Sequence, residues 1–203
     1  MSPMPSSPRP PPDLAEIAAA LGRFGAEVSG PPAAGGTVVR DVRQDSREVR
    51  PGDLFAARAG GATSGVAFVG DAVARGAAAV MAERGVELGA LGVPLLRVDS
   101  VRTALGFAAE AVHGYPSRAL DGAAITGTNG KTTTAWLVEQ AVRGAGGRAA
   151  RLGTLGFALD GEVQDSPLTT PEPDAVSRFL ARARDAGATH FVMEASSHAL
   201  AQR

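Results

Sequence analysis

The chain has 203 residues, 44% of them apolar, and a formal net charge of −1. This length and apolar content are enough for one large or two small packed domains. The balanced charge gives no basis for a nucleic-acid partner, and no apolar run is long enough to span a bilayer. Cysteine is absent, which excludes disulfides and thiolate metal sites. We therefore expect a cytoplasmic protein without nucleic-acid or membrane partners.

The first part of the chain predicts a small α/β domain over residues 13–117. Residues 1–12 are rich in proline and serine and lack the apolar core of a secretory signal, so we expect a disordered leader there. Asp13 is typical of a helix N-cap, and Gly25 of a helix stop. Apolar periodicity and turn residues then predict helices at 13–24, 68–75 and 100–113, and strands at 37–42, 53–57, 77–81 and 93–98.

The second part, residues 118–203, predicts an incomplete domain with a parallel sheet. Its apolar runs indicate strands at 123–125, 148–153 and 189–193, and its periodic segments indicate helices at 135–142 and 173–186. Residues 155–163 resemble a hairpin, because Asp160-Gly161 is a typical two-residue turn. Strand, glycine-rich loop and helix in this order are typical of parallel α/β folds, so the fold class is α/β.

A glycine-rich loop of sequence TGTNGKTTT lies at residues 126–134, between a predicted strand and a predicted helix. Glycines allow such a loop to bring backbone N–H groups close to an anion, and the helix N-terminus adds partial positive charge. Lys131 can reach terminal phosphates, and the Thr132 hydroxyl can bind magnesium. The loop therefore predicts an ATP site that consists of Gly127, Thr128, Asn129, Gly130, Lys131, Thr132 and Thr133.

The alternative interpretation of this loop is an ordinary turn that opens a helix. The motif is not a strict Walker A pattern, because Ile125 stands where that pattern has its first glycine. Yet Lys131 at a helix N-terminus opposes the helix dipole, and three consecutive threonines are poor helix formers. Fold stability alone would not favour this sequence, so we retain the nucleotide-binding interpretation.

A second group of candidates follows other predicted strands. Glu194 closes an apolar strand, and ligands of parallel sheets bind beyond the carboxyl ends of strands, so we expect Glu194 to share magnesium with Thr132. The alternative is that Glu194 caps the turn after it. Thr169 and Thr170 offer two hydroxyls on a loop that is equally compatible with the start of a helix. The three histidines are too scattered for a metal cluster, and a Ser/His hydrolase is disfavoured because the nucleophile elbow is missing.

Four stretches of sequence together resemble the Mur ligases, which build the peptide stem of peptidoglycan. The loop TGTNGKTTT resembles the ATP loop of the family, and DSREVRPGDLF at residues 45–55 resembles its uridine-nucleotide domain. LTTP at residues 168–171 and MEASSHAL at residues 193–200 resemble the E type of the family. The F type, which adds a dipeptide, shares the first two stretches more than the last two.

The resemblance implies an ATP-dependent amide ligase. In the family reaction, ATP phosphorylates the D-glutamate carboxylate of the UDP-N-acetylmuramyl dipeptide, and the amine of a diamino acid, diaminopimelate or lysine, attacks the acyl phosphate. Lys131 would then be the catalytic cation, and Thr132 and Glu194 would hold magnesium. The resemblance also implies a substrate-binding set that consists of Ser46, Thr169, Thr170, Ser196 and Gln202.

The sequence also raises expectations about what this chain alone can do. The family's modified lysine, a second magnesium-binding histidine and the C-terminal domain would follow Arg203, so we expect that the chain does not complete ligation by itself. We expect a monomer. Two alternatives remain open at this point: another Mur-type amide ligase, such as the F type, and a non-catalytic nucleotide-binding fragment.

Overall fold

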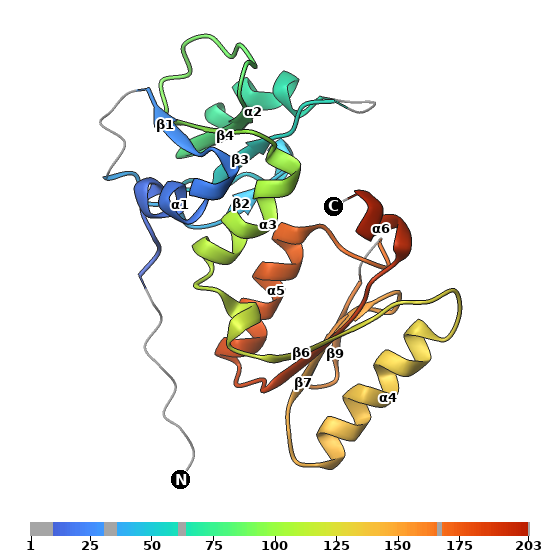
Figure 1. The fold of residues 1–203 in the computed structure, drawn as a ribbon. Helices are drawn as coiled ribbons and strands as arrows, with labels where there is room; N and C mark the ends of the chain where they lie inside the picture. The colour runs from blue at the N-terminus through green and yellow to red at the C-terminus, as the bar shows by residue number, and fades with distance from the viewer. Residues whose placement is uncertain (1–9, 31–35, 61–63, 166–167, 203) are drawn as a thin grey trace. The chain divides into compact units, whose positions relative to one another are not determined.

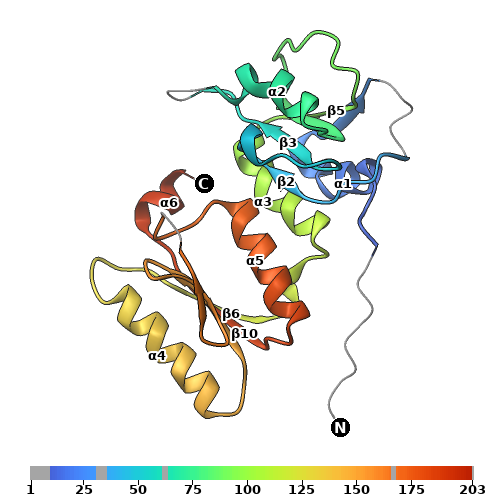
Figure 2. The same ribbon diagram turned by 180° about the vertical axis from the view of Figure 1, so that it is seen from behind.

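The computed structural model describes residues 10–30, 36–60, 64–165 and 168–202, and it divides into two compact units. The N-terminal unit is Pro10–Gly114, and the C-terminal unit begins at Tyr115. Each unit has its own five-stranded mixed sheet with helices on it (Figures 1 and 2). Most of the expected leader falls outside the described residues. Pro12 is buried and its carbonyl accepts the Val39 N–H at 2.9 Å, so ordered chain begins before residue 13.

The sheet of the N-terminal unit has the strand order β1-β5-β4-β3-β2, with β1 antiparallel and the other four strands parallel. The short connections include 3-10 turns at Gly22–Phe24, Ser46–Glu48 and Gly65–Phe68. The regular elements are α1 (Leu14–Ala20), β1 (Glu27–Ser29), β2 (Val42–Arg43), β3 (Leu54–Ala57), α2 (Val69–Ala74), β4 (Ala79–Glu83), β5 (Leu95–Val98) and α3 (Val101–Val112).

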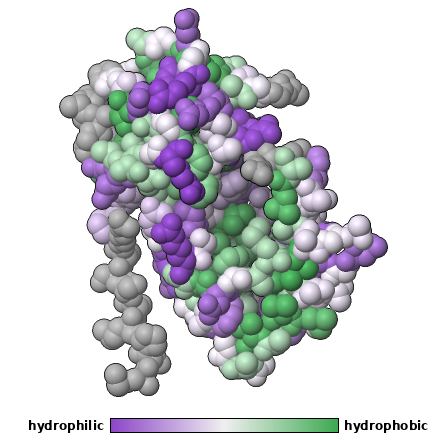
Figure 3. Space-filling view, viewed as in Figure 1, coloured by the Kyte–Doolittle hydropathy of each residue, from purple (hydrophilic) through white to green (hydrophobic). Residues whose placement is uncertain are grey.

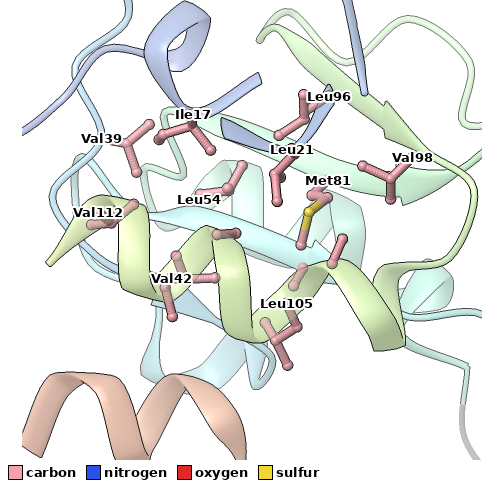
Figure 4. Packing of buried hydrophobic residues seen from close by; sticks show 14 of the residues in the cluster. Ile17, Leu21, Val39, Val42, Leu54, Met81, Leu96, Val98, Leu105 and Val112 are labelled. Atoms are coloured by element: carbon pink, nitrogen blue, oxygen red, sulfur yellow. The ribbon is translucent and has the colours of Figure 1, made fainter. Parts of the chain in front are cut away.

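Two hydrophobic clusters hold this sheet between its helices. Helices α1 and α3 pack on one face, where their apolar side chains meet those of β3, β4 and β5 (Figure 4). Helix α2 packs on the other face. All four residues of β3 are buried, as expected of a central parallel strand covered on both sides. The predicted N-cap at Asp13 is confirmed, because its carboxylate accepts the Glu16 N–H and Glu16 bonds back to the Asp13 N–H.

Three predicted strands of the N-terminal unit are wrong in their extent, and one of them, expected at 93–98, begins only at Leu95. Only Val42 of the stretch 37–42 enters a strand, because the backbone of 37–39 bonds instead to residues 12–14, with one isolated bridge between Asp13 and Val38. The strand expected at 77–81 begins at Ala79, because the N–H of Ala77 still bonds to the end of α2. The described part of the chain contains no helix that is both long enough and apolar enough to cross a membrane.

The C-terminal unit has the strand order β6-β10-β7-β8-β9, in which β6, β10 and β7 are parallel and β8 and β9 form an antiparallel hairpin. The hairpin turn at Asp160 and Gly161 is confirmed, with φ values of 53° and 88°. The elements are β6 (Asp121–Ile125), α4 (Lys131–Gly144), β7 (Ala149–Gly153), β8 (Gly156–Leu159), β9 (Glu162–Gln164), α5 (Pro173–Asp185), β10 (His190–Glu194) and α6 (Ser197–Gln202).

Helices α4 and α5 cover opposite faces of this second sheet (Figures 1 and 2). Helix α4 begins at Lys131, four residues earlier than expected, so that the three threonines occupy its first turn. Apolar surface gathers around α4 in the space-filling view (Figure 3). On this helix, Trp136 and Leu137 are 47% and 54% exposed. Beneath α4, a buried ion pair joins Glu139 to Arg151 of β7 at 2.8 Å.

This ion pair yields a stability prediction. Glu139→Gln removes the charge that compensates the buried Arg151 guanidinium, whose Nη1 has no hydrogen-bond partner among the described residues. We expect a loss of about 3 kcal/mol in the free energy of unfolding. Urea denaturation followed by circular dichroism measures it. The control is Glu162→Gln on the exposed strand β9, which should change stability by less than about 0.5 kcal/mol. Equal effects of the two substitutions would contradict the conclusion that Glu139 compensates the charge of the buried Arg151.

Candidate functional site at the carboxyl edge of the second sheet

Three parallel strands of the C-terminal unit end side by side. Glu194, the last residue of β10, lies opposite Ile125, the last residue of β6, and Met193 lies opposite Leu152 of β7. Because the carboxyl ends of parallel strands share one edge, the segments that follow them come together. These segments are the glycine-rich loop after β6, Thr154 after β7, and Ala195 after β10.

The glycine-rich loop is open to solvent and electropositive. Residues 126–130 are all exposed, and Gly127 and Gly130 have φ values of 140° and 79°, in the region that favours glycine. Gly130 is the N-cap of α4 and offers no side chain to accept the N–H groups of the first turn. The Lys131 ammonium folds back to the Gly127 carbonyl at 2.9 Å. Exposed backbone amides, a helix N-terminus and an ammonium in one place are the features that favour binding of an anion.

Lys131 is also the only lysine in the sequence, in which every other basic side chain apart from histidine is arginine. An ammonium is a compact charge on a flexible stem, and it binds phosphate as a point charge. The use of lysine at this one position therefore fits a specific chemical role for it at the loop.

The Glu194 carboxylate lies behind this loop and is 1% exposed. Its Oε2 accepts the Thr132 hydroxyl at 3.0 Å, and its Oε1 accepts the Thr154 N–H at 2.9 Å. The Thr154 hydroxyl lies 3.2 Å from Oε2 as well. Gly153 permits this close approach, because a Cβ at that position would lie 2.1 Å from Oε1. The alternative role for Glu194, as a cap of the following turn, is instead filled by Ser196, whose hydroxyl accepts the Ala199 N–H.

The donor set fits magnesium. The Thr132 hydroxyl gives its proton to Glu194, so its oxygen lone pairs stay available to a cation. Hydroxyl and carboxylate oxygens are hard ligands, which magnesium prefers, and magnesium commonly completes its shell with phosphates and waters. Among the described residues no group of three or more histidine, cysteine, aspartate or glutamate side chains could hold a metal. A cation here would therefore depend on bound phosphate as well as on Thr132 and Glu194.

The loop that carries Thr169 and Thr170 is brought to the same edge. The Thr170 hydroxyl accepts the Ser196 N–H at 2.9 Å and lies 3.0 Å from the Glu194 carbonyl. It also lies 3.3 Å from the Ser196 hydroxyl. The Thr169 hydroxyl lies 3.2 Å from that of Thr154. Thr154 was not predicted from the sequence, although a glycine-threonine pair at the end of a buried strand could have indicated it.

Two predicted substrate residues remain, Ser46 and Gln202. Ser46 belongs to the N-terminal unit, where it is buried in the 3-10 turn Ser46–Glu48. Its hydroxyl donates to the Asp71 carboxylate, and this hydrogen bond, with Arg75, holds the pKa of Asp71 below its usual value. Gln202 ends α6, and its side chain lies outside the described part. The predicted roles of these two residues remain predictions.

Comparisons with known proteins agree with this architecture. Residues 38–113 match the family described as "Mur ligase family, catalytic domain", and residues 125–203 match the "Mur ligase middle domain". A protein of Pseudomonas aeruginosa named UDP-N-acetylmuramoyl-L-alanyl-D-glutamate–2,6-diaminopimelate ligase is 45% identical over 81% of this chain and 34% of its own length. A protein of the same name from Xylella fastidiosa is 43% identical over 84% of this chain and 35% of its own length.

Solved structures extend the comparison to the fold. A structure of a ligase with the same name superposes with a TM-score of 0.74 and 28% identity, covering 95% of this chain and 37% of that one. The MurF ligase of Thermotoga maritima in complex with ADP superposes at a TM-score of 0.56 and 22% identity, over 78% of this chain and 32% of that one, which supports the fold alone. The chain thus spans about a third of the length of the curated relatives it matches.

Gly153 provides a direct test of this geometry. Gly153→Ala would place a methyl group against the Glu194 carboxylate, so we expect a loss of about 1–3 kcal/mol in the free energy of unfolding through overpacking. Denaturant titration measures it. Gly144→Ala on α4 is the matched control, because nothing lies within 4 Å of its added Cβ and alanine favours a helix. A Gly153→Ala protein as stable as the control would show that Glu194 does not pack there.

Proposed function

The chain belongs to the Mur ligase family, and we propose that it supplies the uridine-nucleotide and ATP sites of a peptidoglycan-precursor ligase. The reaction we propose adds diaminopimelate to UDP-N-acetylmuramoyl-L-alanyl-D-glutamate, the chemistry in the names of relatives that are 45% and 43% identical. Such a reaction consumes ATP and a UDP-linked precursor, so we assign the protein to the cytoplasm. We also propose that it is a monomer.

The observation that carries this proposal is the hydrogen bond between Thr132 and Glu194. It places a hydroxyl and a buried carboxylate side by side behind an exposed loop of backbone amides. A nucleoside triphosphate needs both features, because its phosphates seek amides and an ammonium whereas its magnesium seeks hard oxygen ligands. In this proposal Thr132 and Glu194 hold magnesium, which would supply charge neutralisation on the β- and γ-phosphates when bound.

The proposed reaction has two steps. A D-glutamate carboxylate oxygen attacks the γ-phosphorus of ATP, the bond to the β-phosphate oxygen breaks, and ADP leaves. The amine of diaminopimelate then attacks the acyl carbon, inorganic phosphate leaves with the electron pair of the carbon–oxygen bond, and the amine loses a proton. Phosphorylation is required because a free carboxylate would have to expel oxide. The Lys131 ammonium and the loop amides would stabilise charge on the phosphoryl group in transit.

We also propose that side-chain hydroxyl groups bind the UDP-muramyl dipeptide. Thr169, Thr170 and Ser196 bring three hydroxyl groups to the edge that holds Glu194, and hydroxyl groups suit the carbonyl and phosphate oxygens of such a substrate. We assign Ser46 to the uridine end of the substrate, and Gln202 to the muramyl peptide.

Substitution of Lys131 tests the proposal. Lys131→Met removes the ammonium but keeps a long apolar stem, and we expect the Kd for magnesium and a non-hydrolysable ATP analogue to rise about ten- to hundred-fold. Isothermal titration calorimetry of the whole chain measures it. Arg50→Ala is the control, because it removes an exposed cation from the other unit and should leave the Kd unchanged.

The single lysine offers a second readout. An amine-reactive reagent, followed by peptide mapping, should label Lys131 in the free chain and label it more slowly when the magnesium–nucleotide complex is present. Wild-type affinity of the Lys131→Met variant, together with unprotected labelling, would reject the ATP site. Nucleotide binding without any binding of the UDP-muramyl dipeptide would instead favour a nucleotide-binding protein of another function.

A further inference from the structure

Thr154 is the residue at which the two halves of the candidate site meet. Its N–H donates to Glu194 Oε1 at 2.9 Å, which fixes its backbone against the carboxylate. Its hydroxyl lies 3.2 Å from Glu194 Oε2 and 3.2 Å from the Thr169 hydroxyl. Thr154 therefore touches the carboxylate assigned to the nucleotide side and the hydroxyl assigned to the substrate side.

The turn that carries Thr154 is flanked by two glycines at which a side chain would clash. Gly153 before it has no room for a Cβ beside the Glu194 carboxylate. Gly156 after it has a φ of 82°, and a Cβ there would lie 2.3 Å from the Gln164 carbonyl oxygen. Since the Thr154 N–H is bonded to Glu194 Oε1, the motion relevant here is rotation of the Thr154 side chain and of its hydroxyl proton.

A threonine hydroxyl has one proton and can donate one hydrogen bond at a time. When the Thr154 proton points to Glu194, the Thr154 oxygen can accept the proton of Thr169. When the Thr154 proton points to Thr169, the Thr169 oxygen is the acceptor and its own proton is released toward the solvent side. The two arrangements differ in whether Thr169 can donate to a ligand.

We propose that Thr154 is a positioning residue that couples occupancy of the nucleotide side to donation by Thr169 on the substrate side. A cation held by Glu194 competes for the lone pairs of Oε2, so the Thr154 hydroxyl turns to Thr169. Thr169 then donates its proton to an oxygen of the UDP-linked substrate. The inference rests on the proposed function, and it predicts that nucleotide and UDP-linked substrate strengthen each other's binding.

Calorimetry on the whole chain measures this coupling directly. The Kd of UDP-N-acetylmuramoyl-L-alanyl-D-glutamate is determined with and without saturating magnesium and a non-hydrolysable ATP analogue. We expect the wild-type chain to bind the dipeptide about fivefold or more tightly when the nucleotide is present. Reversing the order of addition should give the same factor, because binding coupling is reciprocal.

Three variants of Thr154 separate the hydroxyl from the rest of the side chain. Thr154→Val keeps the shape and removes the hydroxyl, and we expect the coupling factor to fall to about one. Thr154→Ser keeps the hydroxyl and should retain the coupling. Thr154→Ala is the second hydroxyl-free variant, which gives the answer if the valine variant does not fold. Thr103→Val is the control, because it removes a hydroxyl of the other unit that donates to the carbonyl of Ser100, the N-cap of α3.

The outcomes distinguish the inference from the function on which it rests. Loss of coupling in the valine and alanine variants, with coupling kept in the serine and Thr103 variants, supports the role of Thr154. Coupling that survives removal of the hydroxyl, or a wild-type chain that binds both ligands without coupling, overturns the role of Thr154 and leaves the proposed function intact. A wild-type chain that binds neither ligand overturns both.

Discussion

The site depends on one buried carboxylate. A carboxylate removed from water is costly unless hydrogen bonds compensate it, and Glu194 is only 1% exposed. Its compensation comes from Thr132 on α4 and Thr154 after β7, so satisfying one charge fixes three segments that are far apart in the sequence. The hydrogen bonds that make burial of Glu194 possible also position the glycine-rich loop relative to the strands beside it.

The two sides of this arrangement have opposite charge. The exposed loop presents amides, a helix N-terminus and the Lys131 ammonium, whereas the interior presents the Glu194 carboxylate. A polyphosphate with its cation matches this order, because the anion meets the loop and the cation meets the carboxylate. Thr132 lies at the boundary, where it donates a proton inward and keeps oxygen lone pairs for a cation.

Local sequence signals predicted much of this fold and part of the site. The N-cap at Asp13, the Asp160-Gly161 turn and the helices at α3 and α5 follow from rules that act over a few residues. The structure of the stretch 37–42 was harder to predict. The backbone hydrogen bonds of residues 37–39 go to residues 12–14, and a strand-like sequence pattern does not reveal which segment a strand will pair with. Backbone pairing between segments that are distant in the sequence was therefore the part of the fold that could not be predicted.

The same limit applies to the site. The proximity of Glu194 to Thr132 was predictable, because it follows from the shared carboxyl edge of parallel strands. The contact of Thr154 with Glu194 was not, because it depends on a missing Cβ at Gly153 and on the register between β7 and β10. The sequence alone does not distinguish a glycine that lets a side chain approach the backbone closely from a glycine that only ends a helix.

The central claim is that Thr132 and Glu194 form the cation site of a bound nucleotide. Manganese can replace magnesium in such a site and scatters X-rays anomalously, so a crystal of this chain with manganese and a non-hydrolysable ATP analogue provides the most direct measurement. The account predicts an anomalous peak within bonding distance of the Thr132 hydroxyl oxygen, beside the Glu194 carboxylate, with the phosphates on the loop at residues 127–133. A peak elsewhere, or a nucleotide bound with Thr132 and Glu194 remote from the metal, would contradict it.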